Sequence, residues 1–394
     1  MSEPPFPMQT DMPADASPIY NPARVVTRHI DRLLKAGHID PVPLGGSPHV
    51  ELPTHVRTAA GTLASSSYVD SRGTAQLRQA IAETLGDEGI DCVPEQVLIT
   101  NGAMHGLEIV FSTLLQPGDA VLMPQPGYFV GGLVKRTGAT LQAFASPAAD
   151  SYRPDWGAAR KAVTAATKIL YINTPVNPTG YVYTDEDLAC AWALATEFDL
   201  TIVSDESYSR FTYQSHTHRS ISDLDPEWSR TILVRSFSKD YALSGWRLGF
   251  LVLPDALTEE MASHLEWSCL CVSAPAQRVG IAALQGPQDW VTQIRLDASH
   301  NAPIVAPLIN RIPGLTTVAP KGGLNVLVSY DGDVDRLVRY SITELGLGIQ
   351  PGAAFGAPKA FRFQFGGTEA AIRTGIERLG TGIRFMNQRG KVAR

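Results

Sequence analysis

The sequence predicts an α/β protein with a mainly parallel central sheet flanked by helices, on two observations. Short apolar segments of strand length recur through the middle of the chain, and amphipathic helical segments lie between them, as in repeated strand–helix units. The 394 residues, 44% of them hydrophobic, suffice for a large and a small domain. The expected strands are 97–100, 120–123, 169–172, 201–204, 232–235 and 249–253.

The first part of the chain predicts an arm and then a helix. Residues 1–18 are rich in proline and polar residues, so we expect an N-terminal arm or a disordered segment. Asn21 and Pro22 are typical of a helix start, and the apolar residues that follow share one face: Val26, Ile30, Leu33 and Leu34. The expected domains are a large one of residues 54–295 and a smaller α+β one of residues 19–53 and 296–394.

The next elements predict an anion-binding turn. A helix is indicated by the spacing of Leu77, Ile81 and Leu85, and the strand at 97–100 then runs into Asn101 and Gly102. A second helical face follows at once: Leu107, Val110, Phe111 and Leu114. A glycine at a helix start lets the backbone approach an anion, which the helix dipole favours. Strand–glycine–helix connections are common, so this interpretation depends on the other motifs.

The strand expected at 169–172 is followed by a turn that carries an amide. Pro175, Pro178 and Gly180 favour an extended turn over a helix. Asn177 lies within this turn and offers a neutral donor of the kind that binds a phenolic oxygen. An ordinary turn is the alternative interpretation of this segment.

The strand expected at 201–204 leads directly into an acid. Asp205 would lie at the carboxyl end of a parallel strand, where open α/β sheets bind ligands. An acid there suits a protonated pyridine nitrogen, because the ion pair raises the pKa of the ring nitrogen and lowers that of the carboxylate. Tyr208 follows three residues later and offers a phenol donor. The alternative role of Asp205 is a helix N-cap or a turn residue.

A lysine follows the strand expected at 232–235. Lys239 closes the segment that begins at Ser236, and Arg247 lies eight residues further on. A lysine beside small hydroxyl residues and a fixed cation suits an amine that forms an imine next to a bound phosphate. The alternative is a solvated lysine in an exposed pair with Asp240. Taken with the acid after the preceding strand, these residues favour a site for pyridoxal phosphate.

These segments together resemble one family, the class I/II aminotransferases of the fold-type I pyridoxal phosphate enzymes. The resemblance runs from about Leu44 to the C-terminus, and it implies the fold-type I transferase fold and a homodimer with shared active sites. The motifs stand in the family's order: LGGSP, YVDSRGTAQLRQAIA, TNGAMHGL, PQPGYF, NPTG, SDESY, SFSKDY, SGWRLGF, PGAAFG and FRFQF.

The resemblance implies a role for each matched residue. Lys239 is the Schiff-base lysine and proton shuttle, Asp205 is the partner of the ring nitrogen, and Tyr128 stacks on the ring. Asn177 and Tyr208 are the donors to the phenolate. The implied phosphate-binding residues are Gly102, Ala103, Met104 through its backbone N–H, Ser236, Arg247 and, from the second subunit, Tyr68.

The resemblance also places the substrate. Arg362 is the implied clamp on the α-carboxylate, because a planar guanidinium grips a carboxylate in a bidentate way that lysine cannot imitate. Gly46 and Asn177 line the same pocket. Asn325 stands where the family commonly has an aromatic residue, and Gln364 where it has a small one, so we expect a more polar or roomier pocket. The spacing identifies no second clamp for a dicarboxylate, and the substrate side chain is not predicted.

The function that these residues predict is transamination of an L-amino acid and a 2-oxo acid by a ping-pong mechanism. The same fold also supports pyridoxal phosphate lyases, replacement enzymes and cyclases of the capreomycidine-synthase type, which the early motifs do not separate from a transferase. The acyl-CoA condensing branch is disfavoured because a histidine usually stands where this chain has Tyr128. A cofactor-sensing regulator would need an added DNA-binding domain, for which the N-terminal segment provides little room.

Composition favours an intracellular enzyme. The formal charge of −6 argues against nucleic acid as a partner, and no apolar run is long enough to span a membrane. The N-terminus lacks a basic, apolar signal segment, so we expect a cytoplasmic protein. The four cysteines have no metal-type spacing, and we expect free thiols and no metal site: Cys92, Cys190, Cys269 and Cys271.

Overall fold

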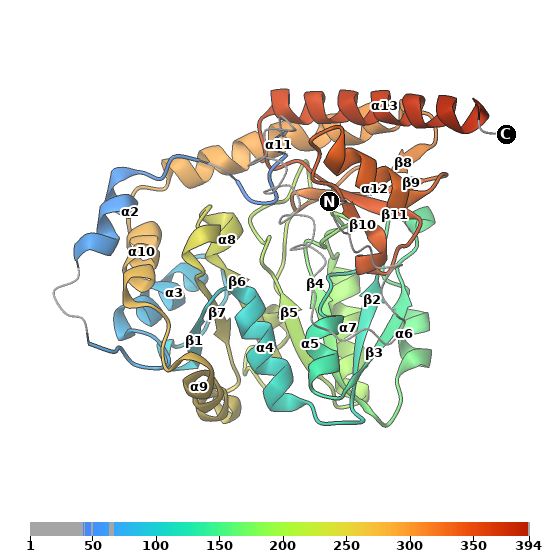
Figure 1. The fold of residues 1–394 in the computed structure, drawn as a ribbon. Helices are drawn as coiled ribbons and strands as arrows, with labels where there is room; N and C mark the ends of the chain where they lie inside the picture. Colours follow the sequence, from blue (N-terminus) through green and yellow to red (C-terminus); the bar gives the residue numbers. More distant parts are fainter. Residues whose placement is uncertain (1–41, 43, 49, 63–66, 393–394) are drawn as a thin grey trace, which may run out of the picture.

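The computed structural model describes residues 42, 44–48, 50–62 and 67–392, which form two sheets with helices around them (Figure 1). The expected arm and the helix after it lie outside these residues. In the larger sheet the strands lie in the order β1-β7-β6-β5-β4-β2-β3. Their bounds are β1 Val97–Thr100, β2 Ala120–Gln125, β3 Thr140–Ala145, β4 Thr167–Asn173, β5 Thr201–Asp205, β6 Thr231–Ser236 and β7 Gly249–Val252.

The larger sheet is mainly parallel, which confirms the predicted fold class. Strands β3, β2, β4, β5 and β6 pair in parallel, whereas β7 is antiparallel to both β6 and β1. All six expected strands are present, and their ends differ from the expected ones by at most two residues. The sequence did not predict β3, because this edge strand exposes several of its residues and lacks a continuous apolar run.

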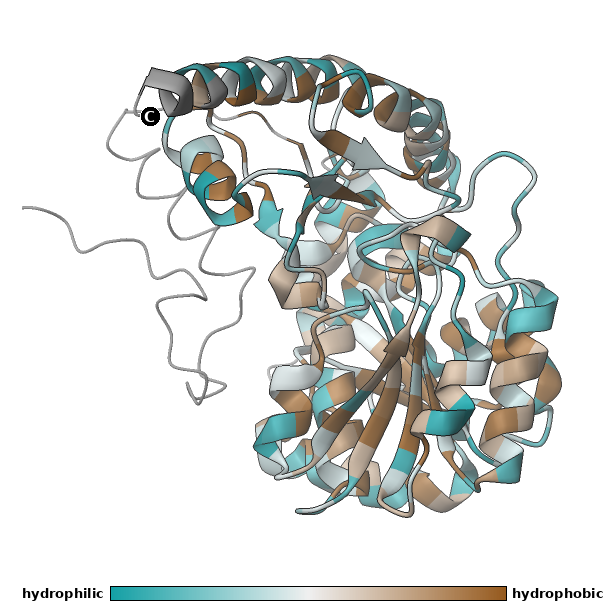
Figure 2. Ribbon diagram, turned by 90° about the vertical axis from the view of Figure 1, so that its right-hand side faces the viewer, coloured by the Kyte–Doolittle hydropathy of each residue, from teal (hydrophilic) through white to brown (hydrophobic). Residues whose placement is uncertain are grey.

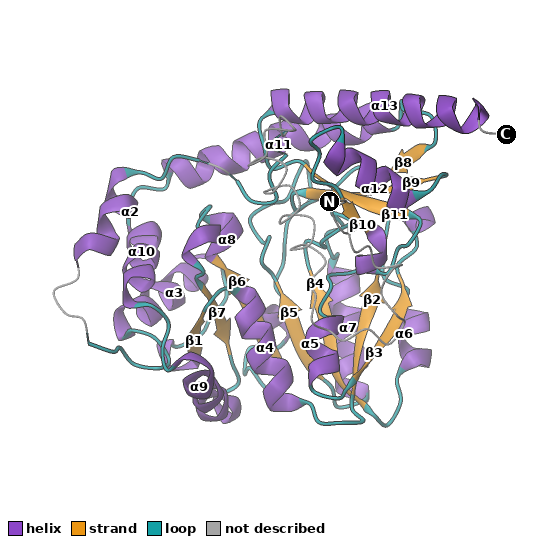
Figure 3. Cartoon of the chain, viewed as in Figure 1, coloured by secondary structure: helices purple, strands orange, loops and turns teal. Residues whose placement is uncertain are grey.

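Helices cover both faces of this sheet (Figure 3), so its strands other than the edge strand β3 are mainly apolar (Figure 2). On one face Ile169, Tyr171 and Val203 pack against helices α4, α5 and α9, and on the other Leu170 and Ile202 pack against α6 and α7. Helices α3 and α10 cover the end formed by β1 and β7. Their bounds are α3 Ala75–Asp87, α4 Ala103–Leu114, α5 Gly131–Arg136, α6 Trp156–Ala162, α7 Asp185–Glu197, α9 Asp255–Cys269 and α10 Ala274–Gln285.

The smaller sheet is antiparallel and has the order β10-β11-β9-β8. Phe361 and Phe363 point from β11 into a core with Leu379 of α13, so the alternate residues of this strand point the opposite way. That opposite face is the one that meets the larger sheet. The bounds are β8 Leu315–Thr317, β9 Asn325–Tyr330, β10 Gln350–Pro351, β11 Ala360–Gln364, α11 Asp289–Ile309, α12 Val334–Thr343 and α13 Glu369–Val392.

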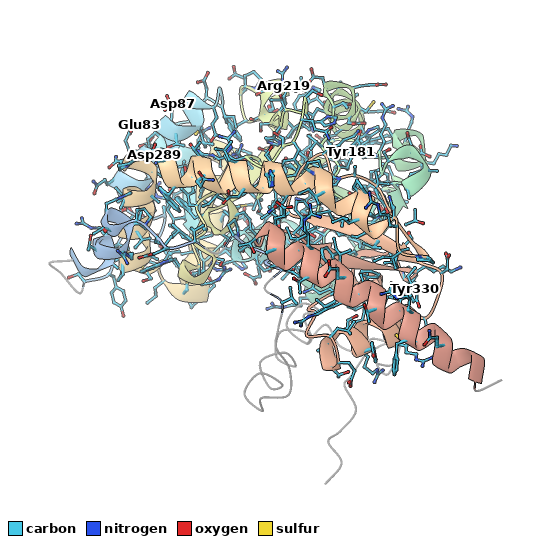
Figure 4. All side chains as sticks on the ribbon, turned by 90° about the horizontal axis from the view of Figure 1, so that it is seen from above. Glu83, Asp87, Tyr181, Arg219, Asp289 and Tyr330 are labelled. Atoms are coloured by element: carbon cyan, nitrogen blue, oxygen red, sulfur yellow. The ribbon has the colours of Figure 1, made fainter. Side chains whose placement is uncertain are left out.

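Helix α11 connects the two parts of the molecule. It runs from beside α2 and α10 to the smaller sheet, where it lies next to α13 (Figures 1 and 4). Val291 packs in the core of the larger sheet, whereas Ile294 and Ala298 pack in that of the smaller one. This change of core supports the proposal that the domain boundary lies near residue 295.

The remaining elements are short. No helix in the described part of the chain is long and apolar enough to cross a membrane. The bounds are α2 Thr54–Ala59, α8 Phe237–Asp240 and the 3-10 helices η2 Ala60–Thr62, η3 Pro94–Gln96, η4 Ala148–Asp150, η5 Ile221–Leu224, η6 Ser244–Trp246 and η7 Gly352–Phe355.

Candidate active site

The predicted site residues gather where the parallel strands end. Asn173, Asp205 and Ser236 are the last residues of β4, β5 and β6, and Asn173 is the register partner of Asp205. The carboxyl ends of parallel strands share one edge of the sheet, where ligands bind in open α/β folds. The smaller sheet adds Asn325 and Arg362 to this edge.

Lys239 lies on the short helix α8, whose start is capped by Ser236. Its Nζ donates to the carbonyl of Gly46 and to the hydroxyl of Ser47, each at 2.5 Å. Burial lowers the pKa of Lys239 to about 7, and the positive charges of Arg362 and Arg247 contribute to this shift. A substantial fraction of the amine is therefore neutral, and nucleophilic, near neutral pH.

Asp205 is a buried carboxyl group with no cationic partner among the described residues. Its side chain accepts hydrogen bonds from the Tyr171 hydroxyl at 3.0 Å, the Ser207 N–H at 3.1 Å and the Ser207 hydroxyl at 2.6 Å. Burial raises the pKa of Asp205 even though these hydrogen bonds oppose the shift. A cation at this position would stabilise the ionised form.

The Tyr208 ring lies beside the Lys239 amine, and Tyr128, Asn325 and Asn177 belong to the same cluster. Lys239 Nζ is 5.7 Å from the centre of the Tyr208 ring, and the Tyr208 hydroxyl accepts from Asn325 Nδ2 at 3.4 Å. Burial raises the pKa of Tyr128, and the neighbouring Asp205 and Tyr208 raise it further, which places all three groups within one electrostatic environment. Asn177 is buried, and its Oδ1 accepts from Arg362 Nη1 at 3.0 Å.

The start of α4 and Arg247 together form a cup for an anion. Gly102 caps α4 with φ +80°, a conformation that favours glycine, and a Cβ there would lie 2.6 Å from Arg247 Nη2 and displace the guanidinium. Arg247 donates to the carbonyls of Ser244 and Asn101, and forms no ion pair with a described residue. The N–H groups of Ala103 and Met104, the first two helical residues, have no acceptor within the helix.

Arg362 is the second uncompensated cation. It is 5% exposed, its Nη1 and Nη2 donate to the side chains of Asn177 and Gln350, and its Nε has no partner in the described part of the chain. The guanidinium lies 5.0 Å from the centre of the Phe355 ring. Burial lowers the pKa of Arg362, and no described carboxylate opposes this effect through an ion pair. A buried cation with a free N–H is suited to bind an anionic ligand.

Two further predicted residues, Gly46 and Asn325, line the pocket, and Tyr68 lies apart from it. A Cβ on Gly46 would lie 2.1 Å from Gln364 Nε2, so the approach of this side chain requires glycine. Asn325 is 1% exposed and contacts Tyr208. Tyr68 is 82% exposed and forms no hydrogen bond or ring contact with the described residues of this cluster, so its expected role in a second subunit stays a prediction.

Four residues that form hydrogen bonds with the predicted site residues were not predicted from the sequence. Ser207 could have been found, because a serine two residues after a strand-end aspartate is typical of a local hydrogen-bonded turn. Tyr171 could also have been found, because it lies two residues before Asn173 on the same face of β4. Ser47 and Gln350 had no such signal, since their contacts with Lys239 and Arg362 depend on how distant segments meet.

The described residues fit pyridoxal phosphate. Pyridoxal phosphate has three groups that the protein must bind: a ring nitrogen, which pairs with an acid, a phosphate, and an aldehyde, which reacts with an amine. Buried Asp205 has no cationic side chain as partner among the described residues, Gly102 and Arg247 form a cup suited to a phosphate, and Lys239 carries an amine of lowered pKa. The substrate's carboxylate would be met separately, by Arg362.

Comparison with known proteins identifies the class and the family. A fold and site of this kind define a pyridoxal phosphate-dependent transferase of amino groups, and the family described as aminotransferase class I and II matches residues 45–379. The chain belongs to the aminotransferase class I and II family, and it is an enzyme.

The relatives cover most of the chain. It is 31% identical over 380 residues to an aspartate aminotransferase of Geobacillus stearothermophilus, covering 92% of this chain and 95% of the relative. It is 32% identical over 327 residues to aromatic-amino-acid aminotransferase 2 of Thermococcus litoralis, covering 79% and 82%. The solved structure of aspartate aminotransferase from Thermus thermophilus with maleate superposes with a TM-score of 0.83 at 29% identity, covering 92% and 97%.

Proposed function

We propose that the protein moves an amino group between an L-amino acid and a 2-oxo acid in two successive half-reactions at this site. The observation that carries the proposal is Arg362, a buried cation with a free N–H and no acidic partner in the described chain, beside the amine of Lys239. An α-carboxylate and an α-amine are the two groups that every amino acid presents. The site therefore has one complementary group for each.

The cofactor would be held by residues of both the strand ends and α4. When bound, pyridoxal phosphate supplies an electron sink for negative charge at the substrate's α-carbon. Asp205 would bind the ring nitrogen and keep it protonated, Tyr208 and Asn177 would donate to the phenolic oxygen, and Tyr128 would pack on the ring. The residues proposed to hold the phosphate are Gly102, Ala103, Met104, Ser236 and Arg247.

Lys239 would move the proton. Its Nζ is held by the Gly46 carbonyl and the Ser47 hydroxyl, and its pKa of about 7 lets it accept and release a proton near neutral pH. Nζ would take a proton from the α-carbon of the amino acid and pass it to the bound cofactor, and in the second half-reaction it would carry a proton to the α-carbon derived from the 2-oxo acid. Desolvation of the partly buried amine is the main cause of the lowered pKa, and the charges of Arg362 and Arg247 add to it.

Arg362 would bind and orient the α-carboxylate. Asn177 and Gln350 fix two of its nitrogens, and Phe355 supports the plane of the guanidinium. Both hydrogen-bonded partners are neutral amides, so the positive charge is left for the substrate. Gly46 would line the same pocket.

The assembly and location are further parts of the proposal. An exposed Tyr68 supports a homodimer in which this phenol reaches the partner's phosphate site. The four cysteines form no disulfide, which supports a reducing, cytoplasmic compartment. The relatives' names cite aspartate in one case and aromatic amino acids in another, so they do not select one substrate for this chain.

A test of the proposal combines single amino acids with one variant. The purified holoenzyme should convert an amino acid to its 2-oxo acid stoichiometrically, with a matching change in cofactor absorbance. Arg362→Lys should keep the cofactor but lower kcat/KM for all amino acids by about 100-fold, because lysine cannot bind a carboxylate in a bidentate way.

The same substitution at exposed Arg311 is the control and should leave kcat/KM unchanged. Near wild-type rates for Arg362→Lys would remove Arg362 from the site. Absence of a 2-oxo acid from every amino acid would overturn the proposed function.

A further inference from the structure

Two amides lie side by side on the active-site face of the smaller sheet. Asn325 is the first residue of β9, Gln364 is the last of β11, and the two are register partners. Directly opposed residues of antiparallel strands point to the same face, and Gln364 shares a face with Arg362 two residues earlier. The amide pair therefore flanks the group proposed to bind the substrate carboxylate.

The hydrogen bonds of this pair are incomplete. Asn325 is 1% exposed, and although its Nδ2 donates to the Tyr208 hydroxyl at 3.4 Å, its Oδ1 has no partner among the described residues. The Gln364 amide forms no hydrogen bond with a described residue and lies against Gly46. A buried polar atom without a partner destabilises the folded protein, so such atoms usually mark the place of a ligand or another missing partner.

The charges around the pair select against an acidic ligand group. The charged groups that act on the Lys239 amine are Arg362 and Arg247. In the proposed function the first binds the α-carboxylate and the second the phosphate. No described cation at the site is left for a second carboxylate, and a buried carboxylate without a cation is strongly disfavoured.

An apolar group is disfavoured for a different reason. It would leave Asn325 Oδ1 buried and unpaired. A carboxamide has both N–H donors and a carbonyl acceptor and no charge, so it can donate to Asn325 Oδ1 and exchange a second hydrogen bond with the amide of Gln364.

We propose that Asn325 and Gln364 bind the side chain of a neutral amino acid that ends in a carboxamide. The inference rests on the proposed function and names its substrate class. Asn325 is the acceptor for the substrate amide, and Gln364 is the adaptable second contact. Arg362 alone carries the charge recognition.

The test compares three substrates of similar length in the holoenzyme: glutamine, glutamate and methionine. The wild-type protein should have a kcat/KM for glutamine at least about tenfold above those for the other two, since each lost hydrogen bond to a polar site costs about that factor. Asn325→Leu and Gln364→Leu, made separately, should each lower the glutamine value about tenfold and change the methionine value less than about threefold. Gln293→Leu, at an exposed amide on α11, is the control and should change none.

Each outcome decides between the possibilities. Preference for glutamate or methionine in the wild-type protein would overturn this inference alone, and so would an equal loss for all three substrates in Gln364→Leu with its cofactor spectrum intact. Formation of no 2-oxo acid from any amino acid would overturn the proposed function as well. If Asn325→Leu does not fold, Gln364→Leu and the wild-type ranking still decide the question.

Discussion

At Lys239 the fold surrounds an amine with groups that disfavour its charge. The side chain is partly buried, and two guanidinium groups add positive potential, so the pKa of Lys239 falls to about 7. The acceptors of its hydrogen bonds, Gly46 and Ser47, hold Nζ in place without supplying a negative charge. Gly46 and Ser47 thus fix the position of Nζ, whereas burial and the two arginines lower its pKa.

The lowered pKa predicts how the amine reacts in the cofactor-free protein. Acylation of Lys239 should increase with pH and be half-maximal near about pH 7, because only the neutral amine is nucleophilic. Arg362→Met should move this midpoint to higher pH, because the Arg362 charge is one cause of the shift. Peptide mapping by mass spectrometry after timed labelling measures both values.

Arg311→Met, which removes an exposed arginine, should leave the midpoint unchanged. A midpoint near the ordinary lysine value of about 10.4 would contradict the assignment.

Asp205 and Arg362 are both buried ionisable groups, and neither forms an ion pair with a described residue. Burial raises the pKa of Asp205 and lowers that of Arg362, which are the directions that favour the neutral forms. A cationic ring nitrogen beside Asp205 would lower the pKa of that carboxyl group, and an anionic carboxylate beside Arg362 would raise the pKa of the guanidinium. In the proposed function, ligand binding therefore supplies the ion pairs that folding leaves incomplete.

At the scale of the element, the start of α4 is built around one glycine. Gly102→Ala should weaken cofactor binding at least about tenfold, because a Cβ 2.6 Å from Arg247 Nη2 displaces the guanidinium and the positive φ is strained. Equilibrium dialysis with pyridoxal phosphate measures the affinity.

Gly118→Ala is the matched control, since Gly118 has φ +96° but a Cβ there meets no atom within 4 Å. It should cost similar conformational strain and leave cofactor affinity unchanged. Equal affinities for the two variants would show that the approach of Arg247 to α4 does not matter.

The strands β5 and β6 are joined behind the site by a buried acid. Glu206 accepts from Ser204, Ser220, Arg235 and His218. Burial by itself would raise the pKa of Glu206, but the neighbouring His218 and Arg235 outweigh it and lower the pKa to about 2. A group with a lowered folded pKa stabilises the protein above its unfolded value and loses this effect as pH falls towards the folded value.

Glu206→Gln should therefore destabilise the protein by roughly 3 kcal/mol at pH 7, and the difference from wild type should shrink as pH falls from about 4.5 towards about 2. Urea unfolding at a series of pH values measures this. Asp223→Asn, which breaks an exposed pair with Arg219, should cost less than about 1 kcal/mol. A pH-independent difference for Glu206→Gln would mean that its charge does not stabilise the fold.

At the scale of the whole molecule, two sheets with separate cores face each other across the site. The larger sheet supplies the acid and, through α8, the amine, whereas the smaller sheet supplies Arg362, Asn325 and Gln364. Large apolar or aromatic side chains stay exposed in the single chain, among them Tyr68 at 82% and Trp267 at 91%. Such exposure supports assembly into a homodimer.

Mixing two inactive variants tests the shared site. Subunits carrying Tyr68→Ala and Lys239→Ala, refolded together in equal amounts, should regain about a quarter of the wild-type activity, since half of the dimers are hybrids and each hybrid has one intact site. Each variant refolded alone is the control. A fully active monomer in sedimentation, or no recovery on mixing, would contradict the shared site.

The sequence by itself determined the order of the elements and the residues at the strand ends. Strands covered by helices on both faces must be apolar throughout, so the runs at 169–172 and 232–235 were recognisable without the structure. The side chain that follows such a run must lie at the ligand-binding edge, which placed Asp205 and Lys239. These inferences are local, and they depend only on neighbours in the chain.

Only the tertiary structure decided which partners hold these groups. Lys239 meets Gly46 across 193 residues, and Arg362 meets Asn177 across 185. The free Oδ1 of Asn325 likewise depends on where the smaller sheet sits above Tyr208. No local periodicity encodes such distances, because they result from the packing of two cores on one another. The chemistry of the site could therefore be predicted from the sequence, and its hydrogen bonds and uncompensated charges could not.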